Sequence, residues 1–97
     1  MALLPVIRTW NAKQDVLAIW AHVAQQSPAA ADRVIARIDR KFAQVRRNPE
    51  LGERIAEGGG MLRRVIAGKY LVFYEVRPDD IAIVRIIHSA RNWQDLL

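Results

Sequence analysis

The residues of this chain best suited to chemistry or ion recognition stand near its C-terminus, in the segment RIIHSARNW at positions 85–93. An apolar run ends there in His88, which is followed by Arg91 and Trp93. An imidazole titrates near neutral pH and can exchange a proton, and a guanidinium can hold a phosphate or a carboxylate. The segment is therefore predicted to be a catalytic site, a recognition surface or a structural cover.

Composition and motif spacing exclude several other kinds of site. The sequence contains no cysteine, which rules out disulfides, thiolate metal ligands and a cysteine nucleophile. The second histidine, His22, lies far from His88 in the sequence and does not give metal-site spacing. The glycines at 58–60 lack the following lysine and helix of a phosphate-binding loop. We therefore expect no metal and no cofactor.

Length and charge predict one domain with an acidic partner. The 97 residues suffice for a single hydrophobic core, so 1–97 is expected to be one domain. The net charge of +5 favours nucleic acid or an acidic protein segment as a partner, without choosing between them. Pro5 and Arg8 interrupt the first ten residues, so we expect neither a signal peptide nor a membrane span, and a cytoplasmic location.

Two amphipathic helices are predicted in the N-terminal half. The first has Asn11 as its N-cap and Trp20 in its apolar stripe. The second has Ser27 as its N-cap, Pro28 in its first turn and its end at Asn48. Because the link between them is very short, the two helices should form an antiparallel hairpin.

Four strands complete the predicted fold. The first is an edge strand, because Pro5 cannot donate to a ladder. The third is apolar on both faces, which indicates a central strand with one side under the helices. The prediction is an α+β fold of order β-α-α-β-β-β, with the helical hairpin packed on one face of an antiparallel sheet. A connector at 48–60 precedes the last three strands, and the four strands are expected at 2–10, 62–66, 70–76 and 81–88.

Four stretches in this order resemble the ParE/RelE toxin superfamily, and its ParE branch most closely. They are the helix beginning AKQDVLAIWAHV, the break RRNPELGERI, the strand pair GKYLVFYEV and IAIVRIIH, and the tail HSARNWQDLL. The resemblance implies the toxin of a type II toxin–antitoxin module, neutralised by a cognate ParD-like antitoxin in a hetero-oligomer. ParE-like toxins are associated with inhibition of DNA gyrase and arrested replication, whereas RelE-like toxins cut mRNA on the ribosome.

Most residues that the RelE resemblance would require are missing. RelE-type enzymes use strand lysines, two arginines and a tyrosine near the C-terminus, but Leu62 and Leu71 stand at two of these positions and the tail has no tyrosine. Arg64, His88 and Arg91 are what remains for a ribonuclease. The resemblance therefore favours a binding protein and not an enzyme. The alternatives are a ribosome-dependent mRNA endonuclease and a non-toxic relative that only binds the antitoxin.

Two groups of residues are predicted to bind partners, because tryptophan and arginine are favoured in binding hot spots. Structural roles compete with this prediction: Trp93 could cover the sheet, Arg85 could pair with Glu75, and the arginines of the second helix could form a solvated face. Neither a membrane partner nor sequence-specific nucleic-acid binding is expected. The predicted target-binding residues are Arg91, Trp93, Arg85 and Arg63. The predicted antitoxin-binding residues are Trp10, Arg33, Arg37 and Arg64.

Overall fold

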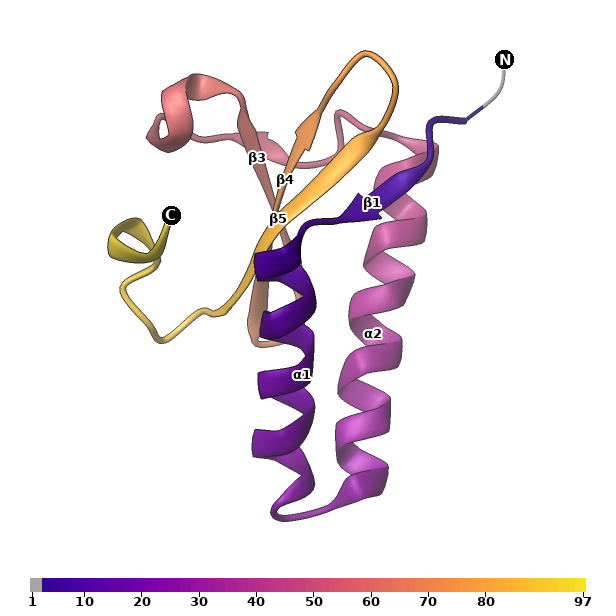
Figure 1. The fold of residues 1–97 in the computed structure, drawn as a ribbon, viewed down its shortest axis with the longest axis vertical. Helices are drawn as coiled ribbons and strands as arrows, with labels where there is room; N and C mark the ends of the chain where they lie inside the picture. Colours follow the sequence, from indigo (N-terminus) through magenta and orange to yellow (C-terminus); the bar gives the residue numbers. More distant parts are fainter. Residues whose placement is uncertain (1–2) are drawn as a thin grey trace.

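A two-helix hairpin covers one face of a five-stranded sheet in the computed structural model, which describes residues 3–97. The C-terminal tail lies on the opposite side of the sheet (Figure 1). The predicted α+β fold, with the helical hairpin on one sheet face, is confirmed. The sheet order is β1-β5-β4-β3-β2. The elements are β1 (Val6–Arg8), α1 (Trp10–Ala24), α2 (Pro28–Arg47), β2 (Glu53–Arg54), β3 (Leu62–Ala67), β4 (Tyr70–Val76) and β5 (Ile81–His88).

The first strand is shorter than predicted, and the first helix begins earlier. Thr9, and not Asn11, is the N-cap of α1: its Oγ1 accepts a hydrogen bond from the Ala12 amide at 3.3 Å and donates to the Ile83 carbonyl at 2.8 Å. Trp10 therefore lies in the first turn of α1 and not in a strand. Residue 2, which the prediction included in the strand, lies outside the described residues.

The edge position predicted for the N-terminal strand is confirmed, but the sheet is not entirely antiparallel. β1 lies at one edge and runs parallel to β5. The other three strand pairs are antiparallel. A parallel neighbour needs a long crossover connection, and the helical hairpin with the strands that follow it supplies that connection.

The predicted helical hairpin is confirmed, but the prediction of a buried Trp20 is wrong. The Ser27 side chain accepts from the Ala30 amide at 3.1 Å and caps α2 as predicted. On α1, the face that meets the sheet contains Ala12 and Ile19. Trp20 is turned away from that face, is 41% exposed, and donates from its indole nitrogen to Asp32 of α2 at 2.9 Å.

The sheet is buried on both faces, as the alternation in β4 predicts. On the helix side, Tyr70 and Val72 pack in the main core beneath α1 and α2. On the other side, Leu71 and Phe73 belong to a second apolar cluster. Part of this second cluster comes from the tail, whose Trp93 and Leu96 pack against it. The second cluster consists of Ile55, Leu62, Leu71, Phe73 and Ile87, with Val84, Trp93 and Leu96 against it.

The connector between α2 and β3 contains two elements that the sequence does not predict. β2 is only two residues long, too short for an alternating pattern. An irregular turn follows it at Glu57–Gly60, where Gly58 and Gly59 adopt positive φ angles of 72° and 75°. The connector is held to the core by Tyr74, whose hydroxyl accepts from the Gly52 amide at 2.8 Å and donates to the Pro49 carbonyl at 2.7 Å. Within residues 3–97, no helix is long and apolar enough to cross a membrane.

Candidate functional site

The C-terminal tail closes the sheet face that the helices leave free. The Trp93 ring lies 5.2 Å from the Phe73 ring, centroid to centroid. The Arg64 guanidinium lies over the outer side of the indole, 5.3 Å from its centroid, and also forms an ion pair with Glu53 of β2. Trp93 is therefore half-buried and acts as a cover for the second apolar cluster, which was the structural alternative for this residue.

Arg85 ties the tail to the first helix. Its guanidinium donates to both carboxylate oxygens of Asp15, at 2.8 and 3.0 Å, and to the Leu96 carbonyl at 2.7 Å. Asp15 also accepts from the Ile86 amide at 2.9 Å. The hydrogen bonds that Arg85 donates to Asp15 raise the pKa of the Arg85 guanidinium. The alternative that Arg85 pairs with Glu75 is wrong, since Asp15 occupies this arginine.

His88 and Arg91 lie at the end of β5, next to the helices. The His88 Nδ1 accepts from the Ala90 amide at 3.0 Å, and the His88 ring meets the Tyr70 ring edge-on at 5.2 Å. Because Nδ1 is an acceptor, neutral His88 carries its proton on Nε2. Arg91 and His88 line a cavity of about 370 Å³ together with His22 and Tyr70. The predicted pair is therefore brought together by the fold.

The three residues left for a ribonuclease do not converge. Arg64 shares the sheet face of Leu62 and lies against Trp93. His88 shares the other face with Tyr70, as the strand pairing and the ring contact show. The sheet itself therefore separates Arg64 from the histidine.

The four predicted target-binding residues do not form one surface either. Arg91 is exposed, Trp93 is half-buried, and Arg85 is occupied by Asp15. Arg63 lies far from these, where it donates to the Gly52 carbonyl at 2.7 Å. Arg63 and its neighbour in β3 point to opposite sheet faces, as their adjacent positions predict.

The predicted antitoxin-binding residues lie on three different elements. Trp10 at the start of α1 is 72% exposed, and Arg33 and Arg37 are exposed on successive turns of α2. Arg64 is on the opposite side of the sheet from them. An apolar row was not predicted: Leu17 and the half-exposed Trp20 follow Trp10 along the outer face of α1. The partner-binding roles of all these residues remain predictions.

Comparison with known proteins identifies the fold and the family. A family model described as the ParE toxin of the type II toxin–antitoxin system, parDE, matches residues 6–93. The chain belongs to this family. It is also similar to toxin RelE2 of Caulobacter vibrioides, with 35% identity over 86 residues, which cover 89% of this chain and 96% of that protein.

Two solved structures share the fold of this ParE-family chain. One is the chromosomal ParDE system from P. aeruginosa, with a TM-score of 0.75 and 19% identity over 89% of this chain and 96% of that one. The other is the toxin–antitoxin complex RelBE2 from Mycobacterium tuberculosis, with a TM-score of 0.66 and 18% identity over 90% of this chain and 99% of that one. These relatives include both ParE and RelE names, so membership of the family does not identify the target.

Several residues around His88 in this ParE-family chain are not among the predicted site residues. Tyr70 of β4 and Lys69 of the turn before it are two of them. His22 was set aside because of its sequence distance, although α1 brings it to the same cavity as His88. Asp15 was not singled out as the partner of Arg85. A single sequence carries no sign of these long-range contacts, because they depend on how α1 packs against β5.

Proposed function

We propose that this chain is the toxin of a type II toxin–antitoxin pair and acts by binding its target, with DNA gyrase as that target and blocked replication as the result. A cognate ParD-like antitoxin would hold it inactive in a hetero-oligomer. The observation that carries the binding mechanism is the second apolar cluster. Leu62 and Leu71, at two positions where the RelE resemblance requires positive charge, are both buried in it.

RNA cleavage needs a base, an acid and positive charge near the phosphate, all accessible to the substrate. The sheet face that contains Leu62 and Leu71 supplies none of these within the cluster, and Trp93 lies across it. The two arginines that the strand pairing places on that face are already paired, Arg64 with Glu53 and Arg85 with Asp15. Burying an unpaired charge among these apolar side chains would be costly, so the face is better suited to stability than to catalysis.

The outer face of α1 supports an antitoxin partner. Its row of Trp10, Leu17 and Trp20 exposes large apolar side chains, and tryptophan is favoured in binding hot spots. A disordered acidic antitoxin segment could fold as an amphipathic helix along this row. The net charge of +5 would speed the association with such a segment. The solved relatives are themselves ParDE and RelBE2 toxin–antitoxin systems.

A supercoiling assay tests the target. Folded protein, freed of any antitoxin, is added to purified gyrase, plasmid and ATP. We expect linear, cleaved plasmid to accumulate. Replacing the exposed Arg91 in Arg91→Gln should raise the protein concentration needed by tenfold or more, which corresponds to about 1.4 kcal/mol of binding free energy. Arg40→Gln, an equal loss of charge at an exposed position of α2, is the matched control and should leave the effect unchanged.

A parallel assay with ribosome-bound mRNA separates the alternatives. Unaffected supercoiling together with mRNA cleavage that His88→Gln abolishes would replace the gyrase proposal by the endonuclease. If folded protein affects neither gyrase nor mRNA, and its expression does not slow growth, the protein is a non-toxic member of the family that only binds the antitoxin. Equal loss of gyrase inhibition in Arg91→Gln and Arg40→Gln would show that general positive charge, and not the tail, contacts the target.

A further inference from the structure

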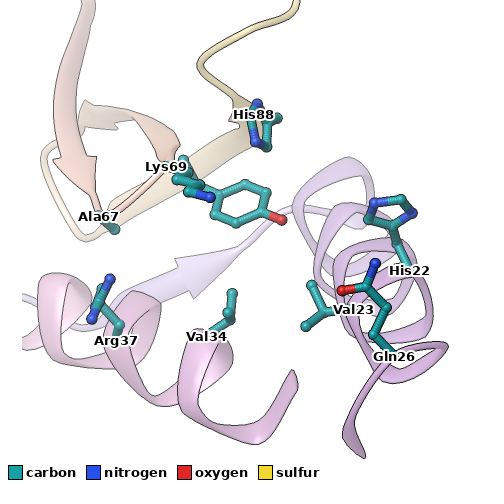
Figure 2. A pocket seen from close by; sticks show the side chains of 10 residues that line it. His22, Val23, Gln26, Val34, Arg37, Ala67, Lys69 and His88 are labelled. Atoms are coloured by element: carbon teal, nitrogen blue, oxygen red, sulfur yellow. The ribbon is translucent and has the colours of Figure 1, made fainter. Parts of the chain in front are cut away.

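The end of the sheet nearest the helical link carries a groove formed by two adjoining cavities. One has a volume of about 340 Å³ and the other of about 370 Å³, and they share His22, Tyr70 and His88 as lining residues. Figure 2 shows the first cavity, with His22 and Val23 of α1 and Gln26 of the helical link on one side. Lys69 of the turn between β3 and β4 and His88 of β5 lie on the other side (Figure 2). Each volume is in the range of small-molecule sites.

Positive groups surround this groove. Arg37 reaches it from α2 and lies directly against the turn between β3 and β4: a Cβ built on Gly68 would be only 2.7 Å from one of its terminal nitrogens. Lys69 of that turn and Arg91 of the tail complete the set. Among the residues that line the two cavities in the described chain, Asp15 is the single acidic side chain, and Arg85 already neutralises it.

The Tyr70 hydroxyl makes no hydrogen bond to any residue from 3 to 97. Tyr70 is only 8% exposed and lines both cavities, but its hydroxyl makes no hydrogen bond to another described residue. Tyr74, on the same face of the same strand, has a hydroxyl with two partners. Burial raises the pKa of Tyr70, so its phenol stays protonated at neutral pH. The hydroxyl is accessible from the cavity, so it is free to donate a hydrogen bond to a ligand there.

We infer that this groove binds a nucleotide, with its phosphate held by Arg37, Lys69 and the Tyr70 hydroxyl. Several donors around one groove suit a phosphate, which offers three acceptor oxygens, better than a carboxylate, for which one arginine fork is sufficient. The floor between the two helices is apolar, with Val23 and Val34, and can accept the base or the sugar. The nucleotide could be free or part of a nucleic-acid strand. The inference goes beyond the proposed gyrase inhibition and does not rest on it.

Direct binding to the full-length protein tests this inference. Titration calorimetry at low salt is carried out with inorganic phosphate, with 2′-deoxyadenosine 5′-monophosphate and with tetraglutamate. We expect the mononucleotide to bind at least fivefold more tightly than phosphate, and tetraglutamate to bind more weakly than either. Tyr70→Phe removes one hydroxyl and keeps the ring, and Arg37→Gln removes one charge. Each should weaken mononucleotide binding about tenfold, because both lose a hydrogen bond to a charged ligand.

The control is Arg40→Gln, which removes an equal charge from the same helix without touching the groove, and it should bind the mononucleotide normally. Competition with a labelled single-stranded oligonucleotide identifies the source: displacement by the mononucleotide indicates a strand phosphate, and no displacement indicates a free nucleotide. Four results would overturn the inference. They are no mononucleotide binding at millimolar concentration, equal binding of phosphate and mononucleotide, equal weakening in Arg37→Gln and Arg40→Gln, and tightest binding of tetraglutamate. Because gyrase takes no part in these titrations, a negative supercoiling result leaves their outcome unaffected.

Discussion

Removing one oxygen from Tyr74 should destabilise the whole fold. The Tyr74 side chain is fully buried, and its hydroxyl links β4 to the connector through Gly52 and Pro49. In Tyr74→Phe the buried Gly52 amide loses its partner, which costs about 1–3 kcal/mol, and the bond to the Pro49 carbonyl contributes about 1 kcal/mol more. We therefore expect the free energy of unfolding to fall by about 3 kcal/mol, measured by urea denaturation followed by circular dichroism.

Tyr70→Phe is the matched control for this experiment. It removes the same atom from the same face of the same strand, but the Tyr70 hydroxyl has no hydrogen-bond partner among the described residues. Its loss should change the free energy of unfolding by less than about 0.5 kcal/mol. If Tyr74→Phe costs no more than Tyr70→Phe, then the Gly52 amide finds another partner, and the assignment of Tyr74 as the anchor of the connector is wrong.

Three further predictions concern the tail, the Asp15 pair and alkaline pH. Asp15→Ala should lower the free energy of unfolding by about 2–4 kcal/mol, because it leaves the part-buried Arg85 without its ion partner; urea denaturation measures this, and a loss below about 1 kcal/mol would contradict it. Trp93→Ala should cost about 2 kcal/mol through lost packing on Phe73, and limited proteolysis should then cut the tail faster than in the parent protein. Burial raises the pKa of Tyr74 above its usual 10.0, against smaller opposing effects of the Gly52 hydrogen bond and the Arg63 charge. The folded state thus binds the Tyr74 phenolic proton more tightly than the unfolded state does. The contribution of protonated Tyr74 to the free energy of unfolding is therefore complete below pH 10.0 and is lost as the pH rises above it. A urea midpoint that stays constant above pH 10 would refute this prediction.

The elements with strong local signals could be predicted from the sequence. Ser27 and Pro28 mark the start of α2, because a capping side chain and a fixed φ angle act within one turn. The alternation in β4 predicts both apolar faces, and 70–76 and 81–88 are the observed bounds of β4 and β5. The helical hairpin and the edge position of β1 also follow from local features. These predictions succeeded because each depends on residues a few positions apart.

The failures involve contacts between distant segments. Trp20 fits the apolar spacing of α1, but the rotation of that helix is set by the sheet beneath it, and the indole lies outside. In β5 a bulge between Ile83 and Arg85 interrupts the pairing with β4. The bulge lets both Ile83 and Ile86 point into the main core, which strict alternation of side chains forbids. The same irregularity precedes Arg85 and its contact with Asp15. The groove around Tyr70 depends on both helices and on β3, β4 and β5 at once, and none of these elements alone carries a sequence pattern that predicts it.

The parallel pairing of β1 with β5 joins two strands that lie far apart in the sequence and are therefore synthesised at different times. Val6 lies opposite Ile81, so the first strand meets its partner only after both helices and the three intervening strands have been synthesised. Any nascent chain that stops before β5 lacks the strand that separates β1 from β4 and the residues that β5 contributes to both apolar clusters, which are Ile81, Ile83, Ile86 and Ile87. Contacts so far apart in sequence form late in folding. The sheet, the groove and the covered face are therefore completed together, once β5 has been synthesised.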